Sequence, residues 1–394
     1  MNLLERESDV FFHTYKRFSL EIERGEGVYL YAKDGSRYLD MFAGLAVNAL
    51  GYGNEKVVTA IQEQAKKYIH LSNYFLPEPQ LTLAELLVKL SGYSKIFFSN
   101  SGTEAIEGAM KLARKWGSAR NKEEIISFSR AFHGRTFGAL SLMDNNKYKE
   151  GYEPFLPNCT IVEFNNPDQF RQAVNAQTTA VILECIQGEG GVRPASKPFI
   201  EELKALKEQF GFLLIADEIQ AGLGRTGKLF AYQHYDLHPD IVVVAKPLGG
   251  GLPLGAFLGN ETVAEILSPG AHGTTFGGNP VACAAGVATL KEIIEQHLME
   301  NAKTIGQLFK SELERLQREF PSIIRELRGE GLMLGIEIDR EGEQIVTAMR
   351  EQRILINCTD KTVLRFLPPL ILQETHVRET VAALRSIFST LPQG

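Results

Sequence analysis

The sequence predicts an α/β protein in which a mainly parallel, seven-stranded sheet is followed by a smaller α+β domain. Between residues 95 and 260, short apolar runs rich in β-branched residues alternate with helical or glycine-rich segments. The runs are Ile96–Phe98, Ile125–Phe128, Thr160–Phe164, Ala180–Glu184, Phe212–Ala216, Ile241–Ala245 and Gly255–Leu258. Runs without polar alternation are typical of strands buried on both faces of a parallel sheet. Ligands of such sheets bind beyond the carboxyl ends of the strands, so the residues after each run are candidates for function.

The segments before the sheet predict an arm, a hairpin and two helices. The first ~20 residues have no strong period and are expected to form an arm. Alternating residues around the turn Asp34-Gly35 predict a hairpin over residues 27–40. Two helices are predicted from apolar residues at helical spacing, which are Val57, Val58, Ile61 and Ala65 in one and Leu83, Leu86, Leu87 and Leu90 in the other.

A more charged region follows a long helical pattern that runs from Pro280 to about His297. Strands are predicted there at Leu332–Ile338, Ile354–Asn357 and Val363–Phe366, mixed with two or three amphipathic helices. The expected division of the chain is therefore threefold. Residues 1–50 form the arm and a hairpin that packs with the small domain, residues 51–290 the large domain, and residues 291–394 the small domain.

Composition excludes several classes of protein. The chain has 394 residues, of which 44% are hydrophobic and 23% charged, which is ordinary for a globular protein and unlike a disordered, collagenous or coiled-coil chain. The net charge is -6, without a clustered basic excess, so no nucleic-acid partner is expected. No apolar run approaches the ~20 residues that a membrane-spanning helix needs.

The start of the chain and its cysteines predict a cytoplasmic protein. Residues 1–7 lack the basic-then-apolar order of a signal peptide. The four cysteines, which are Cys159, Cys185, Cys283 and Cys358, lie far apart and form no C-x-x-C pair. We expect them to be reduced and mostly buried thiols.

Two patterns resemble known sites but fail on inspection. Gly222–Gly227 fits G-x-G-x-x-G, yet Asp217–Gln220 separates it from the preceding strand and no helical period follows, which disfavours a dinucleotide site. The same segment extended to Lys228 does not match a nucleotide-binding P-loop either, because Leu229 occupies the position where that motif requires a metal-binding hydroxyl. His234, Asp236 and His238 could share one face of a strand, but the following proline favours a surface loop, and no metal is expected.

Three other segments carry residue types suited to one chemistry. Asn100–Glu104 follows a strand and opens a helix, so it is either an anion site or an ordinary helix cap. Asp217 ends an apolar strand, where a carboxylate can bind a metal, cap a turn or hold a proton on a ring nitrogen. Lys246 ends the next strand, before three glycines, and is either a buried nucleophilic amine or a lysine that extends to solvent. Pyridoxal phosphate needs an anion site, a carboxylate and an amine together.

These segments resemble those of class III pyridoxal-phosphate aminotransferases of the ornithine and acetylornithine type, from about residue 25 to the C-terminus. The matching runs are Asn100–Ala105, Phe132–Thr136, Asp217–Gln220, the segment around Lys246, and His272–Pro280. The resemblance implies the type I fold of pyridoxal-phosphate enzymes and pyridoxal 5′-phosphate as the cofactor. The sequence departs from the family pattern at Tyr52, Ile106, Cys185 and Pro247, and none of these changes removes a cofactor contact.

The resemblance also implies cofactor contacts for individual residues. Lys246 would bind the aldehyde as an imine and act with Asp217, which would face the ring nitrogen, in catalysis. Phe132 and Ile219 would lie on the two faces of the ring, and Gln220 near its phenolic oxygen. The phosphate would be bound by Ser101, Gly102 and Thr103 and, across the interface of a homodimer, by Thr275.

Substrate contacts follow from the same comparison. Arg135 resembles the arginine that binds the α-carboxylate of the donor, and Thr274 is implied as a further substrate contact. Arg365 resembles the arginine for 2-oxoglutarate, and Glu189 the glutamate that pairs with it when the other substrate is bound. A purely structural ion pair between Glu189 and Arg365 stays open as the alternative.

The implied reaction is the transfer of the terminal amino group of N2-acetyl-L-ornithine to 2-oxoglutarate, a step of arginine biosynthesis. Ornithine δ-aminotransferase or an aminotransferase of succinylornithine or another ω-amino acid is the alternative within the family. Lyases and mutases share the same cofactor scaffold, and a non-catalytic interaction protein is a further alternative.

Overall fold

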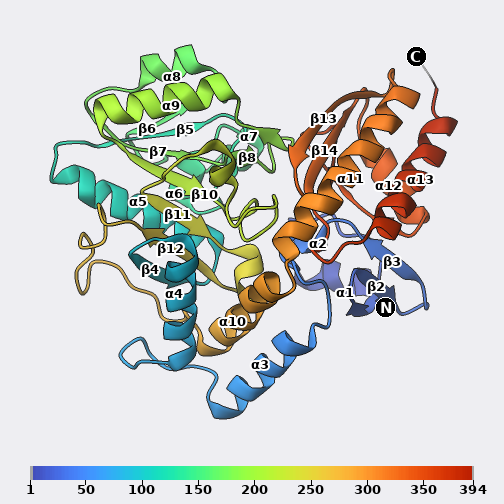
Figure 1. Ribbon diagram of the computed structural model, residues 1–394, viewed down its shortest axis with the longest axis horizontal. Helices are drawn as coiled ribbons and strands as arrows, with labels where there is room; N and C mark the ends of the chain where they lie inside the picture. Colours follow the sequence, from blue (N-terminus) through green and yellow to red (C-terminus); the bar gives the residue numbers. More distant parts are fainter. Residues whose placement is uncertain (1–2, 393–394) are drawn as a thin grey trace.

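The computed structural model describes residues 3–392, and its central element is a seven-stranded sheet (Figure 1). The strands, in their order across the sheet, are β4 (Lys95–Ser99), β12 (Gly255–Gly259), β11 (Ile241–Val244), β10 (Leu213–Asp217), β7 (Thr178–Leu183), β5 (Glu124–Phe128) and β6 (Cys159–Val162). Only β12 runs antiparallel to its neighbours. The short segment 245–254 joins β11 to β12 and leaves no room for the crossover that a parallel pair requires. The predicted mainly parallel sheet is confirmed.

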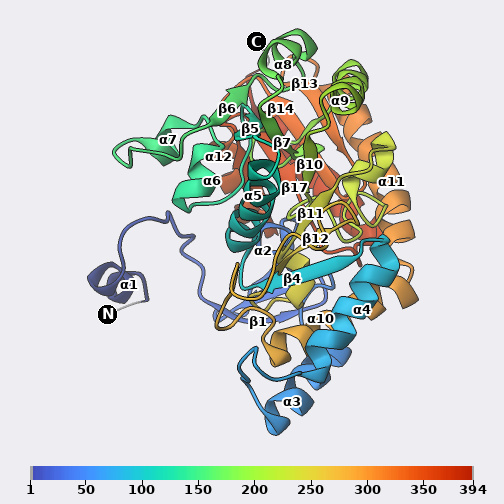
Figure 2. The same ribbon diagram turned by 90° about the vertical axis from the view of Figure 1, so that its left-hand side faces the viewer.

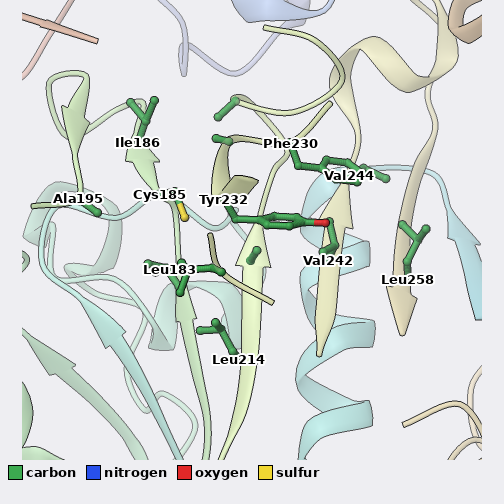
Figure 3. Packing of buried hydrophobic residues seen from close by; sticks show 14 of the residues in the cluster. Leu183, Cys185, Ile186, Ala195, Leu214, Phe230, Tyr232, Val242, Val244 and Leu258 are labelled. Atoms are coloured by element: carbon green, nitrogen blue, oxygen red, sulfur yellow. The ribbon is translucent and has the colours of Figure 1, made fainter. Parts of the chain in front are cut away.

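Both faces of the sheet are buried, as the apolar runs predicted. Along β10, Leu213 and Ile215 pack in one hydrophobic cluster, whereas Leu214 and Ala216 pack in the other. Figure 3 shows Leu214 beside side chains of the neighbouring strands in the second cluster. Successive side chains of a strand point to opposite faces, so a strand buried on both sides needs the unbroken apolar run seen in the sequence.

Helices cover the two faces and flank the sheet. They are α3 (Glu55–Lys67), α4 (Glu78–Ser91), α5 (Gly102–Ser118), α6 (Phe137–Ser141), α7 (Asn146–Lys149), α8 (Pro167–Ala173), α9 (Lys197–Phe210) and α10 (Pro280–Glu295). The two helices predicted before the sheet correspond to α3 and α4, and the long pattern that begins at Pro280 corresponds to α10. The apolar face of α5 packs on the cluster that holds Leu213 and Ile215.

The N-terminal hairpin and the C-terminal region share a second body of structure (Figure 1). One sheet has the order β1 (Ile22–Glu26), β2 (Tyr29–Ala32), β3 (Arg37–Asp40) and β15 (Ile354–Leu355). The other has the order β13 (Ile324–Glu330), β14 (Met333–Ile338), β17 (Val363–Phe366) and β16 (Asn357–Thr359). Helices α11 (Leu298–Glu319), α12 (Glu343–Glu351) and α13 (Glu374–Thr390) pack on them. The chain division at residues 50 and 290 stays a prediction.

Helix α1 (Leu3–Val10) and strand β13 are among the elements that were not expected from the sequence. The arm contains α1, which stands out from the rest of the chain (Figure 2). None of its residues is buried, so no face of this helix packs on the rest of the described chain. Residues 1 and 2 of the predicted arm lie outside the described residues. Among the described residues, strand β13 pairs only with β14 and so lies at the edge of its sheet. Its sequence contains several charged side chains, which suit an edge strand but do not give the apolar run from which the other strands were predicted.

Within residues 3–392, no helix is long and apolar enough to cross a membrane. All four cysteines are unpaired, and of these Cys185 and Cys283 are buried while Cys159 and Cys358 are partly exposed. His234 lies on a short 3-10 helix, η1 (Ala231–Tyr235), where its Nε2 is 3.1 Å from the carbonyl oxygen of Thr226. In the described part of the chain, no three His, Cys, Asp or Glu side chains gather as metal ligands would.

Candidate active site

A cavity of about 430 Å³ opens where β4, β10 and β11 reach their carboxyl ends. This is the edge of the sheet at which the strand-end residues were expected to meet. The predicted site residues that line it are Ser101, Gly102, Thr103, Phe132, Arg135, Glu189, Asp217, Ile219, Gln220 and Lys246. Segments more than 140 residues apart in the chain are thus brought to one cavity.

The N-terminus of α5 forms one end of the cavity. Ser101 caps the helix, since its Oγ accepts a hydrogen bond from the backbone N–H of Glu104 at 3.3 Å. The first N–H groups of a helix have no partner within it and favour an anion. A Cβ atom on Gly102 would lie 2.8 Å from Cδ1 of Ile219, so glycine is needed for this close approach. The segment is therefore a capped helix start that also presents donors to the cavity.

Asp217 ends β10 and is held by two hydrogen bonds. Its Oδ1 accepts from the backbone N–H of Ile219 at 3.0 Å, and its Oδ2 lies 2.7 Å from Nδ1 of His133. Burial alone would lower the pKa of His133, but its hydrogen bond to the charged Asp217 raises that pKa above the usual value. The hydrogen bond to Asp217 thus favours the protonated form of His133, whose Nε2 is buried without a partner among the described residues.

Glu184 is a second buried carboxyl in the lining. Its Oε1 accepts from the backbone N–H of Phe132 at 2.9 Å, and its Oε2 from that of Gly188 at 3.0 Å. Burial, together with the nearby charge of Asp217, raises the pKa of Glu184 to about 7. The carboxyl therefore joins the segment of Phe132 to the loop that carries Glu189.

His133 and Glu184 had no role among the residues predicted from the sequence. Glu184 closes the predicted run Ala180–Glu184, so the rule that selected Asp217, a carboxyl group at the end of an apolar strand, could have selected it. His133 follows Phe132 directly, but nothing local marks it as the partner of a residue 84 positions away.

Lys246 lies beyond the end of β11 rather than on it. The strand ends at Val244, and Lys246 opens a short 3-10 helix, η2 (Lys246–Gly249), with a φ of 40°. A positive φ is strained for a lysine and is held only where the surrounding structure fixes it. Within residues 3–392 its amino group has neither a hydrogen bond nor an ion pair. Burial lowers the pKa of Lys246, which favours the free amine.

Arg365 comes from β17 and meets two predicted site residues. Its Nη1 donates to Oε1 of Glu189 at 2.6 Å and to Oε1 of Gln220 at 3.2 Å. Arg365 is 1% exposed. Burial would raise the pKa of Glu189, but the charge and hydrogen bond of Arg365 lower it below the usual value. The predicted pair therefore exists as a buried ion pair at the cavity.

Arg135 presents a guanidinium group without a carboxylate partner in the described part of the chain. Its Cζ lies 3.6 Å from the centroid of the Tyr148 ring and 5.4 Å from the centroid of the Phe132 ring. Stacking on aromatic rings holds the guanidinium in place while leaving its hydrogen-bond donors free. It can thus receive a carboxylate.

The two threonines of the loop before α10 do not line this cavity. Oγ1 of Thr274 accepts from the backbone N–H of Gly277 at 3.1 Å, and the residue lines a separate hollow with Phe97 and Gln80. Thr275 is exposed. Within one chain Thr274 and Thr275 therefore lie outside the cavity, although Oγ1 of Thr274 accepts a hydrogen bond at 3.4 Å from Nδ2 of Asn100, which lines it.

The glycine pattern at residues 222–227 also lies outside the cavity. It forms a loop between β10 and η1 and opens no α-helix, and Gly227 packs on Lys303 of α11 instead. This loop thus has the irregular form that the missing helical period indicated.

Comparison with known proteins gives one consistent result. The family model "Aminotransferase class-III" matches residues 10–388. The chain is 43% identical to an acetylornithine aminotransferase of Aquifex aeolicus, over 95% of this chain and 99% of that protein. It is 44% identical to an acetylornithine aminotransferase of Methanocaldococcus jannaschii, over 99% of this chain and 98% of that protein. A solved ornithine aminotransferase of Toxoplasma gondii, described with partial occupancy of PLP at its active site, has a TM-score of 0.93 at 30% identity and covers 98% of this chain and 93% of its own.

Proposed function

The chain belongs to the class-III aminotransferases, and on this premise we propose that it transfers the terminal amino group of N2-acetyl-L-ornithine to 2-oxoglutarate. The products are N-acetyl-L-glutamate 5-semialdehyde and L-glutamate. The observation that carries the proposal is the meeting of Lys246, Asp217 and the N-terminus of α5 in one cavity. The choice of donor is supported by curated acetylornithine aminotransferases that are 41–44% identical over nearly the whole chain.

The residues of the cavity fit pyridoxal 5′-phosphate, the cofactor of this family. The N-terminus of α5 offers unpaired N–H groups to a phosphate, and the flat ring can lie between Phe132 and Ile219. Asp217 can hold a proton on the ring nitrogen, and the unpaired amine of Lys246 can bind the aldehyde. When bound, the cofactor supplies a carbonyl that takes up an amino group and a ring that withdraws electrons from the adjacent carbon.

Lys246 carries the proton transfer of the reaction. Its Nζ, once free, takes the proton from C5 of the donor, the carbon that bears the reacting amino group. Burial lowers the pKa of Lys246, so a larger fraction of the amine is unprotonated and can accept that proton. His133 holds Asp217, which faces the ring nitrogen in this proposal, through a contact of 2.7 Å between Nδ1 and Oδ2.

In this proposal Arg135 and Arg365 bind the carboxylates of the two substrates, N2-acetylornithine and 2-oxoglutarate. Arg135 binds the α-carboxylate of the donor. Because the α-nitrogen of the donor is acetylated and cannot react, the terminal amine is the reacting group. Arg365 binds a carboxylate of 2-oxoglutarate, after its ion pair with Glu189 opens. When the donor is bound, Glu189 neutralises Arg365, so one cavity can accept a dicarboxylate and a monocarboxylate in turn.

We further propose that the enzyme is a cytoplasmic homodimer in which Thr275 reaches the phosphate of the partner's site. Thr275 is exposed beside Phe276, and the nearby segment carries Tyr74 and Leu76, which are 97% and 98% exposed. A contiguous exposed apolar patch of this kind supports an interface between protein chains. All four cysteines are unpaired, which supports the proposed location in a reducing compartment, the cytoplasm.

A specificity panel tests the proposed activity. The purified enzyme is assayed with 2-oxoglutarate and each of N2-acetylornithine, succinylornithine, ornithine and 4-aminobutyrate, and glutamate is measured. We expect the highest kcat/KM with N2-acetylornithine and one glutamate formed per aldehyde. A preference for free ornithine would establish the δ-aminotransferase instead, and product formed without a keto acid would indicate a lyase or mutase.

A further inference from the structure

One wall of the cavity begins at a left-handed turn. The four residues of α2 (Ala43–Ala46) have φ values of 49°, 62°, 64° and 65°. Three of them carry a Cβ atom, for which this region of backbone conformation is unfavourable. Strain of this kind is kept only where the surroundings fix it, and it concentrates at functional sites. Val47, the next residue, lines the cavity.

Asp40 holds the start of this turn. It is the last residue of β3 and its exposed fraction is 0%. Its Oδ1 accepts from the backbone N–H groups of Phe42 at 3.0 Å and Ala43 at 2.9 Å, and its Oδ2 accepts from the hydroxyl of Tyr52 at 2.5 Å. A buried carboxyl group is tolerated because it is hydrogen-bonded, so these three donors keep Asp40 under the turn.

Tyr52 is itself held from the opposite side. Its ring occupies the space above Gly25, where a Cβ atom would lie 2.5 Å from Cγ of the tyrosine. Its backbone N–H donates to Gly27 at 2.8 Å and its carbonyl oxygen accepts from Gly27 at 2.9 Å. The hydroxyl therefore points at Asp40 from a position that the N-terminal hairpin fixes.

The turn reaches the cavity through Asn48. Its Oδ1 lies 3.5 Å from the position that a Cβ atom on Gly251 would take, and Gly251 lines the cavity. The neighbouring lining is an apolar wall, formed by Val47, Leu252, Pro253 and Leu254. The ionisable lining residues come from other segments, and they are His133, Arg135, Glu184, Glu189, Asp217 and Lys246.

We propose that Tyr52 is a positioning residue which, through Asp40, holds α2 and so places the apolar wall against the acyl group of the donor. The inference rests on the proposed function, because it assigns a part of that substrate to a part of the cavity. An acyl group has no charge and matches a wall without charged residues, whereas 2-oxoglutarate is bound through its carboxylates by arginines on other segments. Loosening α2 therefore affects the donor more than the acceptor.

The test is the Tyr52→Phe variant of the enzyme with its cofactor. Phenylalanine keeps the ring over Gly25 and removes only the bond to Asp40. We expect KM for N2-acetylornithine to rise roughly tenfold, KM for 2-oxoglutarate to stay within about twofold, and the absorption spectrum of the bound cofactor to be unchanged. Tyr93→Phe is the matched control, since its hydroxyl donates to the carbonyl of Pro239 at 2.8 Å, outside the cavity, and its loss should leave both KM values within about twofold of wild type.

Two results would overturn the proposal. One is an unchanged KM for the donor in Tyr52→Phe, and the other is an equal rise of KM for both substrates, which would mean that the whole cavity is disturbed and not the apolar wall alone. A double-mutant cycle adds a second readout, because Tyr52→Phe should have no further effect in an Asp40→Ala background if Tyr52 acts through Asp40. Additive effects of the two changes contradict the proposal. Failure of the proposed function itself is seen separately, in the wild-type substrate panel.

Discussion

His133 and Asp217 form a buried pair in which Nδ1 of the imidazole lies 2.7 Å from Oδ2 of the carboxylate, with side-chain exposures of 0% and 2%. The pair lies at the end of β10, and its carboxylate lines the cavity. Because the histidine supplies one of the two donors to Asp217, it controls how the carboxylate is oriented.

Removing this donor should slow the reaction without emptying the site. In His133→Leu, Asp217 keeps only the N–H of Ile219. We expect kcat to fall about tenfold to a hundredfold, with cofactor still bound, as measured by steady-state kinetics and cofactor content. His133→Asn is the matched control, because its amide can donate from nearly the same place and should restore part of kcat. A His133→Leu enzyme with wild-type kcat would contradict the assignment.

Lys246→Ala should abolish turnover. The variant lacks the amine that binds the aldehyde and moves the proton, and we expect kcat to fall by at least about a thousandfold. The measurement is glutamate formation at saturating substrates, with and without a small added amine, which should restore a little activity. Substantial steady-state transamination without that amine would refute the role of Lys246.

Asp217→Ala should separate cofactor binding from chemistry. The phosphate and aldehyde contacts remain, so we expect the variant to bind pyridoxal 5′-phosphate weakly and to transaminate hardly at all. Cofactor titration followed by absorbance, together with kcat, checks this expectation. Near-normal activity would show that the ring nitrogen has no such carboxylate partner.

Arg365→Lys should weaken the acceptor selectively. Lysine cannot offer two parallel donors to a carboxylate, so KM for 2-oxoglutarate should rise at least about tenfold. The half-reaction with N2-acetylornithine, followed in a single turnover, should keep a rate within about threefold of wild type, because Glu189 neutralises position 365 during that half-reaction. Equal losses in both half-reactions would favour a purely structural ion pair.

The carboxyl of Glu184 predicts a pH-dependent stability. Burial raises its pKa from 4.5 to about 7, so between these pH values the folded protein binds more protons than the unfolded chain. The free energy of unfolding therefore falls as the pH rises from about 4.5 through about 7. We expect urea unfolding to show a loss of about 1–3 kcal/mol between pH 5 and pH 8 in the wild type that Glu184→Gln does not show. Parallel pH profiles of the two proteins would contradict the prediction.

The strands and the first site residues could be predicted because their signals are local. An unbroken apolar run such as Ile241–Val244 indicates a strand covered on both faces, and a parallel sheet brings the residues after its strands to one edge. Asp217 and Lys246 were found in this way. The antiparallel direction of β12 and the strain at Lys246 were not predicted, since they depend on how the chain leaves β11.

Contacts between distant segments were decided by the tertiary structure. The bond from His133 to Asp217 spans 84 residues and that from Arg365 to Glu189 spans 176, and neither leaves a periodic trace in the chain. The left-handed turn at α2 leaves no periodic trace either, and its first backbone N–H groups are bound by Asp40, which belongs to another element. Apolar periodicity is set by which face of an element is buried, and so it can be read along the chain. The pairing of polar side chains is set by packing in three dimensions, which only the folded structure supplies.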